Sequence, residues 1–250
     1  KKWKEGELLI DFEYEGQPTR LVAERVENQG RESIVRFRWE VPLTFGQLLE
    51  ELGRIPIPPY LGRESEEIDN TRYQTVYSKF EGSVAAPTAG LHFTPDLIEQ
   101  MRGRGFDFEE VTLHVGLSNF RAVDVEDLTK HKMDSEQFII TPEAVESINA
   151  AKREGHKIVA IGTTVMRAME TAVSVGGMLK PMDGWTNKFI FHPYQFTSAD
   201  AFVSNFHLPY STQLMMVAAY GGYEAVMNAY DVARKEGYRF GTYGDAMLIL

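Results

Sequence analysis

Residues 141–167 read TPEAVESINAAKREGHKIVAIGTTVMR, and this stretch decides the fold. The Thr-Pro pair that opens it is typical of a helix start, because threonine caps the first turn and proline fits its first position. We expect this helix to run to about Gly155 and a buried strand to follow at residues 157–162. Thr163 is then expected to cap a second helix. Helix, strand and helix in succession predict an α/β fold.

The same alternation extends to both sides of this stretch. A second Thr-Pro pair, Thr94 and Pro95, predicts a helix that ends at Gly103 or Gly105. The other expected elements are strands at residues 111–115, 189–191, 201–206 and 246–250, and helices at residues 211–222 and 223–236.

The first forty residues have a different character. Short β-prone runs at residues 8–12, 21–26 and 34–39 are separated by turn residues, and they predict a small antiparallel unit. A short helix is expected at residues 44–52, followed by an extended proline-rich segment at residues 55–60. We therefore predict two domains, residues 1–65 and 66–250, of α/β (multidomain α+β) class.

Composition excludes several classes of function. The 250 residues include no cysteine, which excludes disulfides, thiolate zinc sites and a cysteine nucleophile and fits a reducing cytoplasm. Net charge is -10, from 26 basic and 36 acidic residues, and this argues mildly against a general nucleic-acid binder. No apolar run approaches the roughly 20 residues of a membrane span. The chain begins with Lys1 rather than Met and has no signal peptide, so we expect a fragment or a processed chain.

Two segments with candidate functional residues lie in the middle of the chain. Residues 85–94 contain Thr88 and His92 among small residues that let a ligand approach the backbone. The alternative is a tight loop with a structural histidine. His114 lies in an apolar strand that leads to residues 119–121, where a hydrogen-bonded core histidine is the alternative to a catalyst.

Two further segments carry charged residues. His131, Asp134 and Glu136 could form an acid/base group or a metal site, although a solvated turn is the simpler interpretation. Residues 161–167 end a strand and begin a helix, where Thr163, Thr164 and Arg167 could bind a carboxylate or phosphate. This segment has neither a Walker loop nor a dinucleotide fingerprint.

The last polar positions lie close to the ends of later strands. In α/β folds such positions line the ligand crevice. They are Asn205, His207, Ser211, Thr212 and Asp245. From the residues alone, the chain is an α/β protein with a polar crevice.

These segments together resemble the S-adenosylmethionine:tRNA ribosyltransferase-isomerase family. The matching stretches, in the order of the family, are residues 72–77, 85–94, 113–117, 162–164 with Arg167, 205–212 and 243–250. The resemblance implies a small antiparallel β-barrel domain at residues 1–65, of which this chain has all or a part. It also implies a large barrel-like mixed α/β domain at residues 66–250.

The resemblance also implies an activity. The family enzyme transfers and isomerises the ribosyl group of S-adenosylmethionine onto 7-aminomethyl-7-deazaguanine in tRNA with a queuosine-type anticodon. The products are epoxyqueuosine-tRNA, adenine and methionine. S-adenosylmethionine is a co-substrate, no metal or membrane is implied, and the location is cytoplasmic.

Roles follow from the resemblance and the chemistry. A base near the ribose 5′ carbon could be His92, His114, His131 or Glu136. Thr163, Thr164 and Arg167 are chosen for the methionine carboxylate, and Asp245 for a ribose hydroxyl or the methionine ammonium. Further substrate contacts are expected from Thr88, Asn205, His207, Ser211 and Thr212. A basic groove for tRNA could use Arg121, Lys130, Lys132 and Arg167.

The chain departs from the family pattern at three places. The family pattern leads us to expect a further N-terminal segment that these 250 residues do not include. Asp134 stands where a second histidine is usual, and residues 192–195 read HPYQ without the usual glycine. Two other functions therefore stay open: a diverged protein that binds S-adenosylmethionine or a nucleoside and acts on a small molecule, and a non-catalytic relative.

Overall fold

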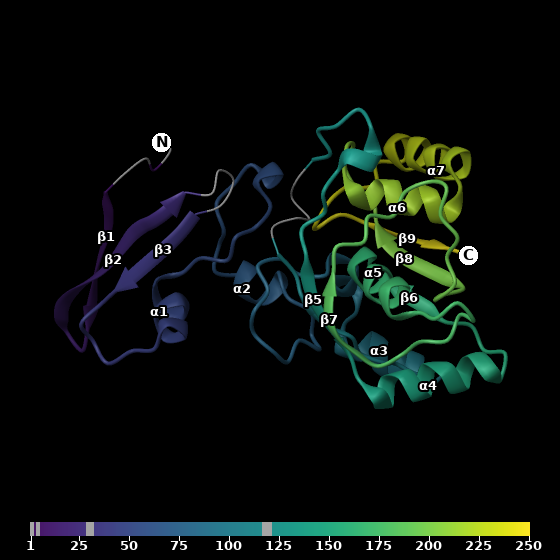
Figure 1. Ribbon diagram of the computed structural model, residues 1–250, viewed down its shortest axis with the longest axis horizontal. Helices are drawn as coiled ribbons and strands as arrows, with labels where there is room; N and C mark the ends of the chain where they lie inside the picture. The colour runs from purple at the N-terminus through teal and green to yellow at the C-terminus, as the bar shows by residue number, and fades with distance from the viewer. Residues whose placement is uncertain (1–2, 4–5, 29–32, 117–121) are drawn as a thin grey trace. The chain divides into compact units, whose positions relative to one another are not determined.

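The computed structural model describes residue 3 and residues 6–28, 33–116 and 122–250 (Figure 1). The chain divides into two compact units, residues 1–54 and 55–250. The division thus precedes the proline-rich segment, whereas the sequence placed it near residue 65. Within the larger unit, the hydroxyl of Tyr60 lies 2.6 Å from the Thr242 hydroxyl and accepts the Thr242 amide, which ties this segment to the C-terminal part.

The small unit is built on a three-stranded antiparallel sheet in the order β1-β2-β3. Its strands are β1 (Glu7–Tyr14), β2 (Gln17–Asn28) and β3 (Ser33–Arg38), as the sequence predicts. Glu15 and Gly16 both have positive φ, 50° and 76°, which is the conformation of a two-residue type I′ hairpin turn.

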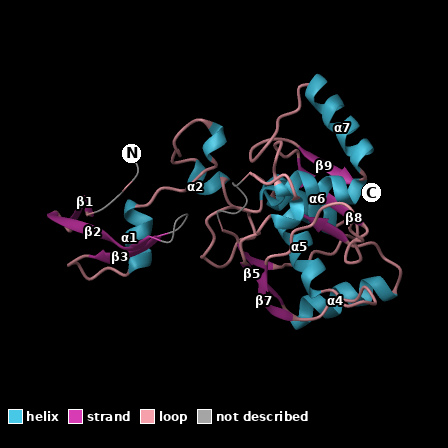
Figure 2. Ribbon diagram, turned by 45° about the horizontal axis from the view of Figure 1, so that its top comes forward, coloured by secondary structure: helices cyan, strands magenta, loops and turns pink. Residues whose placement is uncertain are grey.

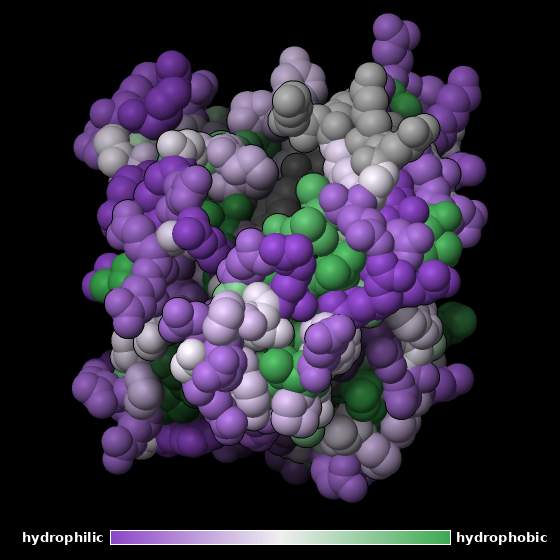
Figure 3. Space-filling view, turned by 90° about the vertical axis from the view of Figure 1, so that its left-hand side faces the viewer, coloured by the Kyte–Doolittle hydropathy of each residue, from purple (hydrophilic) through white to green (hydrophobic). Residues whose placement is uncertain are grey.

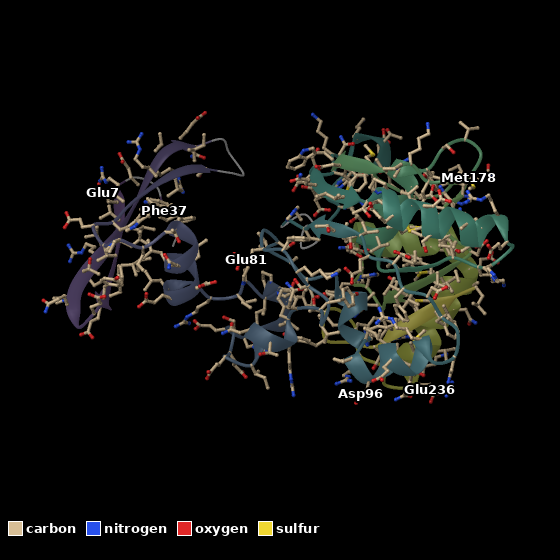
Figure 4. All side chains as sticks on the ribbon, turned by 90° about the horizontal axis from the view of Figure 1, so that it is seen from below. Glu7, Phe37, Glu81, Asp96, Met178 and Glu236 are labelled. Atoms are coloured by element: carbon tan, nitrogen blue, oxygen red, sulfur yellow. The ribbon has the colours of Figure 1, made fainter. Side chains whose placement is uncertain are left out.

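A short helix, α1 (Phe45–Leu52), completes the small unit. Thr44 caps it in a capping box with Gln47, and Gly53 follows its last residue, as expected. The ring of Phe37 on β3, labelled in Figure 4, lies 5.0 Å from the ring of Phe45. The described part of the small unit contains no closed barrel.

The first part of the larger unit consists mostly of loops and short helices (Figure 2). These helices are η1 (Pro59–Leu61), α2 (Asp69–Arg72), η2 (Thr88–His92) and α3 (Pro95–Arg102). The Thr94 side chain caps α3, which confirms the expected helix start. Asp69 is buried and accepts two hydrogen bonds from Arg63 and one from the Tyr243 hydroxyl, so a buried carboxylate anchors these loops.

An antiparallel sheet follows, in the order β4-β5-β7. It contains β4 (Thr112–His114), β5 (Glu136–Ile140) and β7 (Met182–Thr186). The sequence missed β5 and β7, because β7 reads MDGWT, which has little of the usual strand composition. The strand expected at residues 189–191 does not form. Instead, the rings of Phe189 and Phe191 pack 4.9 Å apart.

The third sheet contains the two strands whose ends border the pocket described below. It contains β6 (Val159–Ile161), β8 (Ala201–Asn205) and β9 (Ala246–Ile249), with β6 parallel to β8 and β9 antiparallel to it. The helices around it are α4 (Pro142–Arg153), α5 (Thr163–Ala172), α6 (Thr212–Gly221) and α7 (Tyr223–Lys235), and α6 and α7 lie side by side (Figure 1).

Two details of the β6–α5 connection differ from the prediction. Val159 is 41% exposed, so β6 is only partly buried. The residue before the first turn of α5 is Gly162 rather than Thr163, and no side chain caps this helix. The turn needs a φ of +100°, which glycine adopts without strain and threonine does not.

One hydrophobic core supports the larger unit. Phe138 of β5, Met166 of α5, Phe202 of β8 and Val217 of α6 are all fully buried in it. Burial of each such side chain contributes about 1.5–3 kcal/mol. The core therefore fixes α5 and α6 against β8.

Candidate functional site

A pocket of about 160 Å³ lies at the carboxyl ends of β6 and β8. Parallel strands end at the same edge of a sheet, and α/β proteins bind ligands at this edge. The loop after β6 leads into α5, and the loop after β8 leads into α6. The described lining residues are Tyr60, Tyr73, Ala85, Ala86, Pro87, Thr88, Ala89, Ala122, Gly162, Thr163, Thr164, Ser204, Asn205, His207, Leu208, Pro209, Tyr210, Ser211, Gln213, Gly241 and Thr242.

Asn205, the last residue of β8, has a buried side chain with an unused oxygen. Its amide nitrogen donates to the carbonyls of Gly241 at 3.0 Å and Thr242 at 3.4 Å. Its Oδ1 is buried and has no hydrogen-bond partner among the described residues. An unsatisfied buried acceptor costs about 1–3 kcal/mol, so a ligand that donates to it would recover this energy.

Tyr73 carries a second unused group. The residue is 3% exposed, and its hydroxyl meets no partner of normal hydrogen-bond geometry in the described chain. Burial raises the pKa of the Tyr73 phenol above its usual range, and the Ala86 amide offsets this only in part. The phenol therefore keeps its proton and can donate it in a hydrogen bond.

His207 contributes a neutral imidazole to the wall. Dense packing around the ring lowers its pKa to about 4, although part of the residue opens to the pocket. Its Nε2 lies 2.7 Å from the Ser204 hydroxyl, and its backbone N–H donates to the Tyr230 hydroxyl. At neutral pH the ring is therefore uncharged.

The N-terminus of α5 forms another part of the wall. Thr163 and Thr164 are buried there, 9% and 6% exposed, in the first turn of a ten-residue helix. Backbone N–H groups of a first turn have no intrahelical acceptor, so this end favours an anionic or electron-rich ligand group.

Thr88 and Ser211 also line the pocket, as part of tightly built loops. Thr88 begins η2, where Gly90 packs so closely that an added Cβ would lie 2.2 Å from the Tyr77 hydroxyl. Ser211 caps α6 by accepting from the Leu214 amide, and its hydroxyl donates to the Leu208 carbonyl. Ser211 therefore shapes the loop. Thr212 is buried next to it but lies outside the pocket lining.

Arg167 and Glu136 form a buried ion pair, contrary to the separate roles that the sequence suggested. Arg167 Nη1 lies 2.7 Å from Glu136 Oε2, and the guanidinium also donates to the Lys188 and Thr186 carbonyls. Arg167 is 4% exposed and is absent from the lining of this pocket, but it lines a second, smaller pocket that shares Thr163 and Gln213 with it. Glu136 Oε1 accepts the Gly116 amide. With these partners, Arg167 holds β5 and α5 together, and its expected contact with a substrate carboxylate stays a prediction.

The three expected catalytic histidines lie elsewhere. His92 is exposed at the end of η2. The ring of His114 packs against Gly82, so closely that a Cβ added to this glycine would lie 2.7 Å from the ring. His131 follows η4 (Leu128–Lys130), and its ring packs 4.8 Å from that of Phe189. None of the three is among the described lining residues.

Asp245 closes a loop instead of facing the pocket. Its Oδ2 accepts the Arg239 amide at 2.7 Å, and its backbone amide donates to the Arg239 carbonyl. In the described part of the chain, no group of three or more His, Asp or Glu side chains is arranged to hold a metal ion. The expected positions Leu117, Asn119, Phe120 and Arg121 lie outside the described residues.

The sequence analysis missed Tyr60, Tyr73 and Thr242. Tyr60 and Thr242 are 182 positions apart and meet only in the folded chain. Tyr73 lies in the stretch at residues 72–77 that carries the family resemblance, and this was the available signal.

Comparisons with known proteins show the family of this chain. The family model described as Queuosine biosynthesis protein matches residues 1–249. The chain belongs to the queuosine biosynthesis protein family. A relative from Bacteroides fragilis, named S-adenosylmethionine:tRNA ribosyltransferase-isomerase, is 56% identical over 240 residues, which cover 95% of this chain and 68% of the relative. A relative of the same name from Phocaeicola vulgatus is 55% identical with the same coverage.

A solved structure extends this to the fold of the queuosine biosynthesis family. The S-adenosylmethionine tRNA ribosyltransferase from Thermotoga maritima is 32% identical, with a TM-score of 0.53, over 92% of this chain. The chain spans 62% of the length of that structure. The resemblance to the ribosyltransferase-isomerase family is therefore confirmed, as is its mixed α/β class. None of the described helices has the length and apolarity needed to cross a membrane.

Proposed function

We propose that this chain carries out, or contributes the S-adenosylmethionine site to, the ribosyl transfer and isomerisation that makes epoxyqueuosine in tRNA. One observation carries the proposal. Four stretches that resemble the family, residues 72–77, 85–94, 162–164 and 205–212, supply lining residues to the same pocket. They meet at the carboxyl edge of β6 and β8, where an α/β fold binds small molecules.

The chemistry assigns roles to the pocket residues. The first turn of α5, with Thr163 and Thr164, offers N–H groups to an electron-rich part of S-adenosylmethionine. His207 is the acid/base candidate that the geometry favours, because it lines the pocket and its Nε2 lies 2.7 Å from the Ser204 hydroxyl. His92, His114, His131, Glu136 and Asp245 would need a bound tRNA or a changed conformation to reach the same ligand.

The tRNA is the second proposed substrate. Lys130 and Lys132 are exposed and could contact phosphates. Arg167 is buried, so we no longer include it among the residues proposed to contact tRNA. Lys130 lies 3.6 Å from Asp127, an exposed pair that a phosphate can disrupt. Binding to tRNA should weaken with added salt, and Lys130→Ala with Lys132→Ala should reduce the slope of that dependence.

The finer architecture belongs to the same proposal. We infer that β1, β2 and β3 are part of the small antiparallel barrel that the resemblance implies. Leu8, Leu9 and Ile10 of β1 are 48%, 52% and 44% exposed, although successive residues of a strand point to opposite faces. Figure 3 shows apolar side chains exposed among hydrophilic ones on the face that it views. The large unit would then be the barrel-like domain of the family. The proposed location is the cytoplasm, where tRNA is modified.

The deciding assay mixes the protein with S-adenosylmethionine and tRNA that carries 7-aminomethyl-7-deazaguanine. We expect tRNA-dependent release of adenine and methionine. Thr164→Val removes one pocket hydroxyl and should raise the KM for S-adenosylmethionine, whereas Thr71→Val, at an exposed position of α2, should not.

Two other outcomes would support the alternatives. Adenine release without tRNA would indicate an enzyme that acts on a small molecule. Absence of both release and tRNA binding would indicate a non-catalytic relative and overturn the proposal.

A further inference from the structure

The pocket contains two buried polar groups that make no hydrogen bond of normal geometry to the described residues. They are Asn205 Oδ1 and the Tyr73 hydroxyl, on residues that are 1% and 3% exposed. Both residues line the pocket. Since buried polar groups are nearly always hydrogen-bonded, a pair of unsatisfied groups in one pocket indicates a ligand that satisfies them.

The two groups have opposite hydrogen-bonding character. The Asn205 amide is fixed in orientation, because its nitrogen donates to the Gly241 and Thr242 carbonyls, which can only accept. Its oxygen is therefore available to accept a hydrogen bond from a ligand. The Tyr73 phenol keeps its proton and is available to donate one. The ligand must present at least one donor and one acceptor to this pocket.

The side chains in the rest of the lining carry no formal charge, which suits an uncharged, electron-rich ligand group. None of the described lining residues is Asp, Glu, Lys or Arg, and His207 is neutral at pH 7. The methionine part of S-adenosylmethionine carries a carboxylate, an ammonium and a sulfonium, whereas its adenine is neutral. The volume of about 160 Å³ is also below the roughly 300 Å³ at which pockets for whole small ligands begin.

We propose that this pocket is the adenine subsite for S-adenosylmethionine, with Asn205 and Tyr73 as the residues that recognise the base. This rests on the function proposed above. Adenine presents a 6-amino donor next to a ring-nitrogen acceptor, and guanine has oxygen in place of that amino group. Asn205 Oδ1 accepts from the 6-amino group, and the Tyr73 hydroxyl donates to a ring nitrogen.

The test measures binding of adenine, hypoxanthine and S-adenosylmethionine to the intact protein by calorimetry. Hypoxanthine has an oxygen in place of the 6-amino group and should bind at least about tenfold more weakly than adenine, because two acceptors then face each other. Tyr73→Phe should weaken adenine and S-adenosylmethionine roughly ten- to hundredfold. Its Tm should change little, because this hydroxyl makes no hydrogen bond of normal geometry to the described residues.

Tyr194→Phe is the matched control. The Tyr194 hydroxyl donates to Glu170 at 2.9 Å, outside the pocket lining, so this variant should lose stability and keep its affinity for adenine. If S-adenosylmethionine binds and reacts but hypoxanthine matches adenine, or Tyr73→Phe binds adenine normally, the adenine assignment is wrong and the proposed function stands. If neither S-adenosylmethionine nor adenine binds the protein, both proposals fail.

Discussion

The His207 imidazole should make the stability of the folded chain depend on pH. Its pKa in the folded chain is about 4, against an ordinary value of 6.5, because packing disfavours the charged ring. Between these pH values the unfolded chain therefore binds more protons than the folded chain. The stability that the neutral imidazole contributes is lost as pH falls from about 6.5 to 4. The loss should reach up to about 3 kcal/mol.

Urea denaturation between pH 4 and 7 measures this effect for the wild type and for His207→Gln. Carboxyl groups titrate in both proteins, so the difference between the two curves isolates the imidazole. Curves that run parallel over the whole range would show that burial of His207 does not govern its titration.

The Arg167–Glu136 pair should act on stability rather than on substrate. Arg167→Ala leaves the Glu136 carboxylate buried without its guanidinium partner and should cost about 3–5 kcal/mol. The double variant Arg167→Met with Glu136→Leu removes both charges and should cost clearly less than the sum of the single variants. Denaturation curves test the stability, and calorimetry tests S-adenosylmethionine binding. A double variant that is stable but has lost binding would restore the carboxylate-binding role expected from the sequence.

At the scale of elements, Gly162 sets the turn between β6 and α5. Its φ is +100°, and an added Cβ would meet only ordinary contacts, 3.6 Å from the Ala89 Cβ. Gly162→Ala should therefore cost about 1–3 kcal/mol through backbone strain alone, and it should weaken ligand binding by moving the first turn of α5. Gly176→Ala, where φ is not positive and no atom lies within 4 Å, should change neither quantity. Equal denaturation midpoints for the two variants would contradict the role of the turn.

Local signals in the sequence predicted elements far better than they predicted the site. The Thr-Pro starts gave α3 and α4, because caps are decided by neighbouring residues. The ion pair of Arg167 was not predicted, because its partner, Glu136, lies 31 residues away on a strand that the sequence did not reveal. Asn205, His207 and Ser211 line the pocket, because they lie at the end of β8 and in the loop that follows it. The contribution of Tyr73 depends on which atoms the fold leaves unpaired, and no local pattern records this.

The two units of the molecule differ in how much core they contain. The buried apolar side chains among the described residues of the small unit are Leu21, Ala23 and Leu48. The main core lies entirely within residues 55–250, and so do all described lining residues of the pocket. Stability and small-ligand binding should therefore depend on the larger unit.

Removal of residues 1–54 tests this division. A domain with its own core folds alone, so we expect residues 55–250 to unfold cooperatively and to bind S-adenosylmethionine with an affinity close to that of the whole chain. Circular dichroism during heating measures the folding, and calorimetry measures the binding. Any contribution of the small unit to tRNA would appear separately, as weaker tRNA binding at the same salt concentration. Cooperative unfolding together with a loss of S-adenosylmethionine binding would mean that the small unit completes the pocket, and the site would then have to be redrawn to include it.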